Sequence, residues 1–187
     1  AFITTQSIKK LKKFLKEWAL DTKGWSLSGD SKEYDISQLE KTIETKQYYQ
    51  NKVFYKERWI KENDLEQKLI VTYSLKYKDY QRRIRNNQIE RAQKAIETNS
   101  IKLEKCNQND YKRFVSRTSL TKDGEIADKK ILSLNLEQIE KEEQYDGFYG
   151  VCTNLDDDAE EIIKINQRRW EIEESFRIMK SEFKARP

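Results

Sequence analysis

Charged side chains are as frequent as apolar ones in this chain, and that balance limits its fold more than any other feature. Of the 187 residues, 37% are charged and 36% apolar, against an average near ~25% charged in soluble domains. We therefore expect a small core, with most helix and strand faces lying against water or a charged partner. The length fits one domain or one and a half, and the net charge of +4 by itself indicates little about partners.

The residue types that are missing exclude several classes of site. The sequence has no His, which excludes a Ser-His-Asp triad, a His-ligated zinc and an imidazole base. Its five glycines form neither GxxxxGK[ST] nor GxGxxG. Two cysteines, Cys106 and Cys152, match neither a disulfide framework nor a four-ligand metal site, and we expect buried thiols. Neither a membrane span nor a signal peptide is recognisable, so we predict a cytoplasmic protein.

Local patterns predict strands and helices in alternation. A helix capped by Ser7 is expected, in which Ile8, Leu11, Leu15 and Trp18 recur at helical spacing, and Ser74 is expected to cap a second, longer helix. The predicted fold class is α/β or α+β, with helices in excess. The expected segments are a strand over 2–5, a helix from 8, a loop over 21–35, a hairpin of 53–60 with 67–74, a helix over 74–99, strands over 113–120 and 130–134, an apolar strand after 146 and a last helix that starts among the acids of 156–161.

The helix expected over residues 75–97 is strongly basic. It has no Gly or Pro, and its apolar residues form only a thin stripe. A helix of this kind can follow DNA phosphates in a salt-dependent way. The alternatives are a solvated basic face and a helix–helix contact. The candidate DNA-binding residues are Arg82, Arg83, Arg85 and Arg91.

The last helix carries the residues with the greatest chemical interest. Arg169, Glu173 and Lys180 are separated by four and seven residues, which places them on one strip of a helix. A carboxylate between two cations could hold a divalent ion while the cations hold a phosphate. The alternative is simple ion pairing on a solvated helix, which the spacing alone favours. The acids from Asp156 to Glu161 are explained by the dipole at the helix start.

The sequence around this strip resembles a known family. Residues 145–187, including FYGVCTN and IEESFRIMKSEFKARP, look like the C-terminal part of the catalytic domain of bacterial insertion-sequence transposases of the DDE superfamily. In that family a strand ending in Thr-Asn precedes a helix with Tyr, then Arg, Glu and Lys at intervals of three, four and seven. Arg169, Glu173 and Lys180 match the last three positions, whereas Asn166 replaces the tyrosine. Residues 2–20 and 80–92 resemble the same family more loosely.

The resemblance implies an RNase H-like catalytic domain with an inserted region. Residues 1–33 would belong to the core, 34–144 to the insertion, and 145–187 to a core strand and the helix that carries Glu173. In the family two Asp and one Glu hold two divalent ions, usually Mg²⁺ (or Mn²⁺), which activate water or a DNA 3′-hydroxyl. Glu173 would be the catalytic, metal-binding Glu, with Arg169 and Lys180 on phosphates. Both Asp would precede Ala1, because Asp146 is better explained as a turn residue.

The chain is therefore expected to be part of a longer transposase and to be inactive alone. The implied partners are double-stranded DNA at the transposon ends and the target, with a homodimer assembling on DNA in the bacterial cytoplasm, associated with the nucleoid. One alternative function is a non-catalytic DNA-binding or assembly module. Another is a helix-rich protein-interaction domain with no nucleic-acid role.

Overall fold

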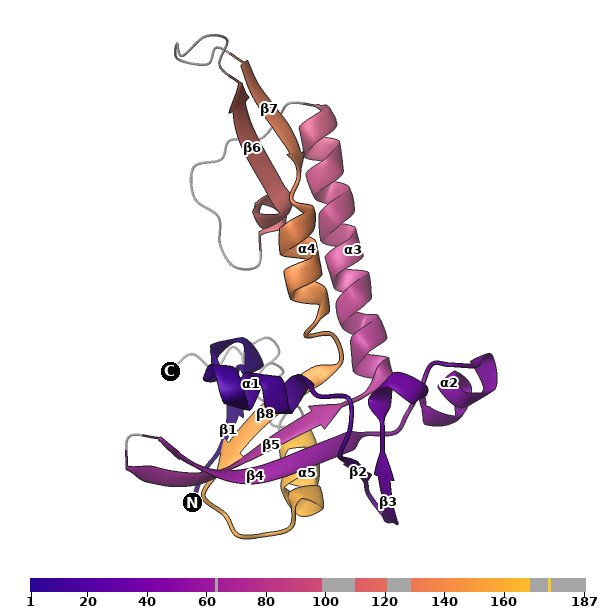
Figure 1. Cartoon of the computed structure of the whole chain (residues 1–187), viewed down its shortest axis with the longest axis vertical. Coiled ribbons are helices and arrows are strands. Elements are labelled where there is room, and N and C mark those ends of the chain that lie inside the picture. The colour runs from indigo at the N-terminus through magenta and orange to yellow at the C-terminus, as the bar shows by residue number, and fades with distance from the viewer. Residues whose placement is uncertain (63, 99–109, 121–128, 169–174, 176–187) are drawn as a thin grey trace. The chain divides into compact units, whose positions relative to one another are not determined.

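The computed structural model describes residues 1–62, 64–98, 110–120, 129–168 and 175. The chain divides into two compact units, each with strands and helices (Figure 1). Unit 1 comprises residues 1–47, 52–73 and 149–187, and unit 2 comprises residues 48–51 and 74–148. The expectation of a mixed α and β fold is confirmed.

Unit 1 is built on a six-stranded sheet in the order β1-β8-β5-β4-β2-β3. The predicted hairpin is confirmed, because β4 pairs antiparallel with β5 from Phe54 opposite Tyr73 to Glu62 opposite Leu65. The pairs β1 with β8, β2 with β3 and β2 with β4 are also antiparallel. The strands are β1 (Ile3–Gln6), β2 (Trp25–Leu27), β3 (Asp30–Tyr34), β4 (Phe54–Glu62), β5 (Leu65–Tyr73) and β8 (Phe148–Thr153).

The segment 21–35, predicted to be a loop, contains β2 and β3, so that prediction is wrong. Trp25 and Leu27 are buried, with the half-buried Ser26 between them, which is the alternation of a short strand. Gly29 lies in the turn between the two strands with φ +77, a left-handed conformation that glycine adopts without strain. A three-residue strand beside a Ser-Gly turn is too short to produce a recognisable periodicity.

The helix predicted to begin after Ser7 is interrupted. A 3-10 turn, η1 (Ile8–Lys10), is followed by extended backbone at Leu11 and Lys12, and only then by α1 (Lys13–Leu20). Of the four apolar residues at the expected spacing, Ile8, Leu11 and Leu15 are nevertheless buried, whereas Trp18 is half-buried. Ser7 makes no side-chain capping bond. The next short elements are η2 (Ile36–Gln38) and α2 (Ile43–Tyr49).

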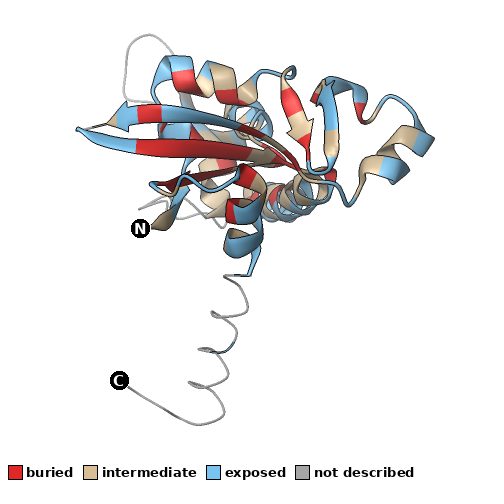
Figure 2. Cartoon of the chain, turned by 90° about the horizontal axis from the view of Figure 1, so that it is seen from below, coloured by how far each residue is buried: buried red, intermediate tan, exposed pale blue. Residues whose placement is uncertain are grey.

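The last described helix, α5 (Ala159–Gln167), covers one face of the sheet in unit 1. Ala159 and Ile162 are buried in a cluster with Ile70 of β5 and Val151 of β8. Buried residues are concentrated along the strands in Figure 2. Burial of apolar surface between α5 and the sheet favours the folded state of the unit.

Unit 2 combines a long helix with a two-stranded sheet. Its elements are α3 (Leu75–Glu97), η3 (Tyr111–Phe114), β6 (Val115–Leu120), β7 (Lys129–Leu134) and α4 (Leu136–Glu143). β6 and β7 pair antiparallel, as predicted. Ala92, Phe114 and Val115 form the buried core. Ser74 caps α3, since its hydroxyl accepts a hydrogen bond from the Tyr77 N–H at 3.1 Å, which confirms the predicted start of this helix.

The division into units differs from the one expected from the sequence. The β4–β5 hairpin was expected in the inserted region 34–144, but it lies in the same sheet as β1 and β8. The residues that form the separate unit are therefore 74–148, together with 48–51.

Candidate nucleic-acid interface

The side of α3 that faces away from the core of unit 2 carries a strip of cations. Ala92 and Ala95 of α3 are buried. At about 100° per residue, three exposed side chains lie on the opposite side of the helix: Lys76, Arg83 and Lys94. Because α3 rises about 1.5 Å per residue, this strip is roughly 27 Å long. It can therefore follow phosphates along several base pairs of a duplex.

Arg82 and Arg91 are also exposed, and because they are nine residues apart they lie about 180° from each other around α3, on either side of this strip. The Arg91 guanidinium lies 5.0 Å from the Tyr111 ring centroid, and that of Arg83 lies 5.9 Å from the Tyr80 ring. Such contacts orient a guanidinium while its N–H groups can still donate to a phosphate. The three exposed arginines predicted from the sequence therefore lie on α3 as expected, but they do not share one face of it.

Arg85, the fourth predicted DNA contact, is buried and does not face solvent. Only 5% of its side chain is exposed, and its Nη1 and Nη2 donate to the two carboxylate oxygens of Asp146, both at 2.6 Å. Glu143 accepts a further bond from Nη2 at 3.3 Å. The hydrogen bonds to Asp146 raise the pKa of Arg85. In this position Arg85 holds α3 to the segment after α4 and is not part of the exposed strip.

Asp146, interpreted from the sequence as a turn residue, is the buried partner in this pair, with 6% of its side chain exposed. The turn itself is present: Gly147 has φ +86, and its N–H donates to the Gln81 Oε1 at 2.7 Å. Its carbonyl accepts from the Ser74 N–H at 3.1 Å. The Asp-Gly pair therefore ties the start of α3 to the end of unit 2. No local sequence signal relates residue 146 to residue 85, which is 61 positions earlier.

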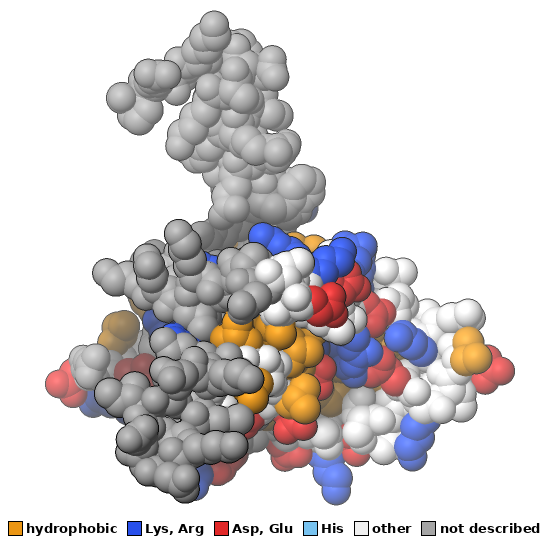
Figure 3. All heavy atoms as spheres, turned by 90° about the horizontal axis from the view of Figure 1, so that it is seen from above, with side chains coloured by type: hydrophobic (Ala, Val, Ile, Leu, Met, Phe, Trp, Pro, Cys, Tyr) orange, Lys and Arg blue, Asp and Glu red, His pale blue; other side chains and the backbone are white. Residues whose placement is uncertain are grey.

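The net positive charge of the exposed surface of α3 is moderate. On the face shown in Figure 3, acidic and basic side chains lie among one another. With Arg85 neutralised by Asp146, six cationic residues of α3 remain against three carboxylates. These are Lys76, Lys78, Arg82, Arg83, Arg91 and Lys94 against Asp79, Glu90 and Glu97. An excess of this size suits phosphate contacts that weaken steeply with salt.

The Thr153-Asn154 pair, part of the pattern that resembles the transposase family, fastens the end of β8. The Thr153 hydroxyl is fully buried, donates to the Phe2 carbonyl at 2.7 Å and accepts from the Leu155 N–H at 3.1 Å. The Asn154 side-chain oxygen accepts from the Phe2 N–H at 2.9 Å. Together these bonds fix where the chain leaves the sheet before α5.

The start of α5 is held by contacts with β4 and β5. The buried Lys68 ammonium donates to the Asp157 carbonyl at 2.9 Å and pairs with Glu57 at 3.4 Å. The Tyr55 hydroxyl reaches Glu160 at 3.5 Å, and burial raises the pKa of this tyrosine. The acids at the helix start are therefore partly engaged in packing as well as complementing the helix dipole.

The predicted catalytic strip lies beyond this anchored helix. Arg169, Glu173 and Lys180 are outside the described residues, so their contacts are not part of the description. Within the described ranges, no group of three or more His, Cys, Asp and Glu is placed to hold a metal ion. Where the helices are described, none is long and apolar enough to cross a membrane. Cys152 is buried, as expected, whereas Cys106 lies outside the described residues.

Comparisons of the chain with protein-family models, with curated proteins and with solved structures find no significant match.

Proposed function

We propose that this chain is part of a DDE transposase that cleaves and joins DNA during transposition of an insertion sequence. The observation that carries the proposal is the strand-to-helix unit of β8 and α5. Its Thr153-Asn154 end is fixed by hydrogen bonds, and in the sequence it is followed by Arg169, Glu173 and Lys180 at the intervals of the family signature. The absence of His from the sequence is compatible with chemistry based on carboxylates and metal ions.

In this proposal Glu173 is a metal-binding carboxylate, and Arg169 and Lys180 contact phosphate oxygens. The divalent ions, Mg²⁺ or Mn²⁺, supply an activated water or 3′-hydroxyl and stabilise the leaving oxygen. Oxygen ligands suit both ions. Two further aspartates are needed, and we propose that they precede Ala1 in the complete protein, in an RNase H-like core. The 187 residues alone then bind metal poorly and cleave nothing.

The test of the catalytic role is Glu173→Gln in the complete transposase. The expected result is loss of strand cleavage with Mg²⁺ while binding to the transposon ends is retained, because the amide keeps the shape of the side chain but is a poor metal ligand. Glu174→Gln is the matched control, since it removes the same charge one position away, outside the Arg-Glu-Lys intervals. Cleavage retained by Glu173→Gln contradicts the assignment.

The proposed DNA-contact surface is the exposed strip of α3. Replacing Lys76, Arg83 and Lys94, the cations of this strip, with Gln should weaken duplex binding and lower the slope of log K against log salt by up to about 2.7, the value for three lost phosphate contacts. The control variant removes three exposed cations of unit 1 and so changes the net charge equally: Lys23→Gln, Lys32→Gln and Lys41→Gln. Equal loss in both variants indicates a general charge effect and contradicts a specific surface on α3.

A second candidate function is a non-catalytic DNA-binding or assembly module. The exposed arginines of α3 favour it as much as they favour the transposase, because they require no catalytic residue. This module would be selected if the 187-residue chain binds duplex DNA and Glu173→Gln leaves cleavage by the complete protein unchanged. Absence of duplex binding at low salt would instead favour a protein-interaction domain. Sedimentation of the chain with and without duplex tests the homodimer that we propose forms on DNA.

A further inference from the structure

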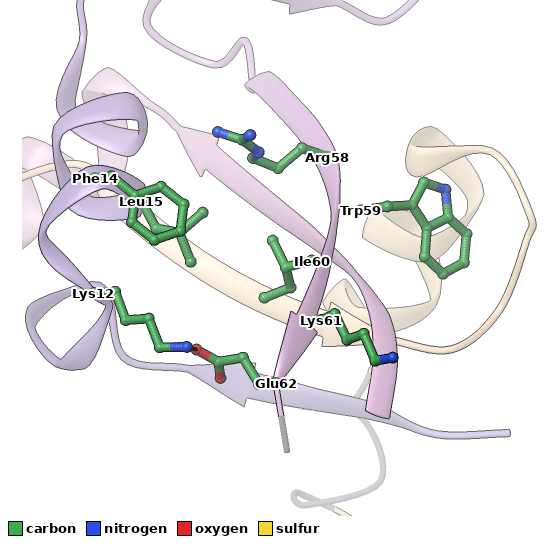
Figure 4. A pocket seen from close by; sticks show the side chains of 8 residues that line it. All are labelled: Lys12, Phe14, Leu15, Arg58, Trp59, Ile60, Lys61 and Glu62. Carbon is green, nitrogen blue, oxygen red and sulfur yellow. Dashed lines mark ion pairs between the residues drawn. The ribbon is translucent and has the colours of Figure 1, made fainter. Parts of the chain in front are cut away.

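Unit 1 contains a small pocket between α1 and β4 (Figure 4). Its volume is about 210 Å³, equivalent to roughly seven water molecules and smaller than most sites for drug-sized ligands. Leu15, which is 1% exposed, and Ile60, which is 9% exposed, form an apolar floor. The pocket is lined by Lys12, Phe14, Leu15, Arg58, Trp59, Ile60, Lys61 and Glu62.

An aromatic ring and two cations border this floor. The Phe14 ring is 58% exposed and lies beside Leu15, and Lys12 and Arg58 extend on either side of the floor in Figure 4. Lys12 pairs with Glu62 at 3.7 Å. The Arg58 guanidinium lies 5.2 Å from the Trp18 ring, and among the described residues no carboxylate pairs with it within 4 Å.

Trp59 and Lys61 line the pocket only from the edge of the strand. Their side chains project from the opposite face of β4, as Figure 4 shows and as the alternation of a strand requires. The Lys68 ammonium lies 5.5 Å from the Trp59 ring on that other face. The aromatic surface that faces the pocket is therefore that of Phe14.

The position of α1 over β4 is fixed by a buried lysine. Lys56 of β4 donates from its ammonium to the Asp21 carbonyl at 2.8 Å and to the Trp18 carbonyl at 3.4 Å, at the C-terminal end of α1. The Trp25 indole N–H also donates to the Asp21 carbonyl, at 2.8 Å. Cations at a helix C-terminus are favourable. The pocket is thus held between two fixed elements before any ligand binds.

We propose that this pocket binds one unpaired nucleotide of a single-stranded DNA segment, with the base on Phe14 and the adjoining phosphates on Arg58 and Lys12. Single-strand sites combine an aromatic platform with a basic groove; here Phe14 is the platform, and Lys12 and Arg58 are the cations that border it. A base inside a duplex is stacked on its neighbours and cannot offer its face to Phe14. The proposal rests on the proposed role in DNA processing, which exposes strand ends. The pocket is separate from the cationic strip of α3 and does not include Glu173.

The chemistry of the pocket favours this occupant over a purely apolar one. An apolar peptide side chain would fill the floor but would leave Arg58 without an anion, whereas Lys12 would keep its pairing with Glu62. A phosphate alone would use the cations but would leave the exposed Phe14 ring uncovered. A nucleotide satisfies both parts, because it carries a flat apolar face and a negative charge in one residue.

The test uses fluorescence anisotropy of the chain with fluorescein-labelled oligothymidylate of about eight nucleotides. An abasic oligonucleotide of the same length serves as a probe with matched charge. Phe14→Ala should weaken binding of oligothymidylate by about 5- to 150-fold, the range for loss of one stacked base, and should change binding of the abasic strand little. Arg58→Gln should weaken binding of both strands. Phe14→Trp should restore oligothymidylate binding, because it keeps the aromatic face.

Tyr48→Ala is the matched control, since it removes another exposed aromatic ring, 67% exposed, outside the pocket. Equal binding of the abasic strand and oligothymidylate by the unmodified chain would overturn the base site and leave only phosphate contacts. An unchanged affinity in Phe14→Ala, or no binding of oligothymidylate at low salt, would also overturn it. Duplex binding that persists in Phe14→Ala and is lost in the α3 variant shows that the two surfaces are separate, so failure of this inference is distinguishable from failure of the proposed function.

Discussion

The buried pair of Arg85 and Asp146 allows the sharpest prediction of stability. Asp146→Ala leaves the Arg85 guanidinium, 5% exposed, with only Glu143 at 3.3 Å as a carboxylate partner. Breaking a buried pair by removing one partner costs about 3–5 kcal/mol, because a charge stays buried without compensation. Loss of two hydrogen bonds to a charged group, at about 1.5–3 kcal/mol each, gives a similar range. We therefore expect the free energy of unfolding of unit 2 to fall by about 3–5 kcal/mol.

The two units can be followed by different signals during urea denaturation. Every described tryptophan, Trp18, Trp25 and Trp59, lies in unit 1, whereas the 23-residue helix α3 lies in unit 2. Circular dichroism at a helix wavelength therefore reports strongly on unit 2, and tryptophan fluorescence reports on unit 1. At typical slopes of about 1–3 kcal/mol per molar urea, the expected loss moves the helix transition by at least about 1 M.

A double-mutant cycle separates the pair from its surroundings. Arg85→Met alone should also destabilise unit 2, because it leaves the Asp146 carboxylate buried. The double variant Arg85→Met with Asp146→Leu should recover most of the loss, since apolar replacement of a buried ion pair is often neutral or favourable. Asp156→Ala removes an exposed carboxylate and should change stability by no more than about 0.5 kcal/mol. A cost below about 1 kcal/mol for Asp146→Ala, or additive single effects in the cycle, would refute the reasoning.

Three further predictions concern single positions. Gly150→Ala should destabilise unit 1 by about 1–3 kcal/mol in urea unfolding, because a Cβ at this position would lie 2.6 Å from the Gln6 carbonyl oxygen. An unchanged urea midpoint would contradict this close approach. Burial raises the pKa of Cys152 to about 11, so its thiol stays protonated at pH 8. In a Cys106→Ser background it should therefore react with iodoacetamide at pH 8 only after unfolding. Rapid labelling of the native protein would contradict the burial. Ser74→Ala should cost about 0.5–2 kcal/mol through loss of the α3 cap, seen as a lower midpoint in the helix signal but not in tryptophan fluorescence.

The elements with strong local signals could be predicted from the sequence. The segment after Ser74 has a capping residue and no helix breaker, and it forms α3. The β-branched and aromatic runs around Trp59 and Leu69 form the β4–β5 hairpin. Leu15 shows that burial can be predicted even where backbone geometry is not, since it is 1% exposed although the expected helix is broken at Leu11.

The features that the sequence did not reveal depend on contacts between distant residues. Arg85 and Arg83 are equivalent in a pattern of charges, and only the fold separates a buried pairing residue from an exposed one. The pocket beside Phe14 likewise requires α1 and β4 to pack together, with Lys56 on one and its carbonyl acceptors at the end of the other. Charge and periodicity identify a basic helix but not which of its cations remain available to a ligand.

The hydrogen bonds that Thr153 and Asn154 form with the Phe2 backbone have a consequence for how the protein folds. These bonds join residues about 150 positions apart, with separations of 151 and 152. Contacts of such long range form slowly, because the intervening chain must first be ordered or closed into a loop. Unit 2 is almost continuous in sequence and rich in local helix contacts. During synthesis unit 2 can therefore fold first. The sheet of unit 1 is completed only when β8 has been synthesised and lies between β1 and the β4–β5 hairpin.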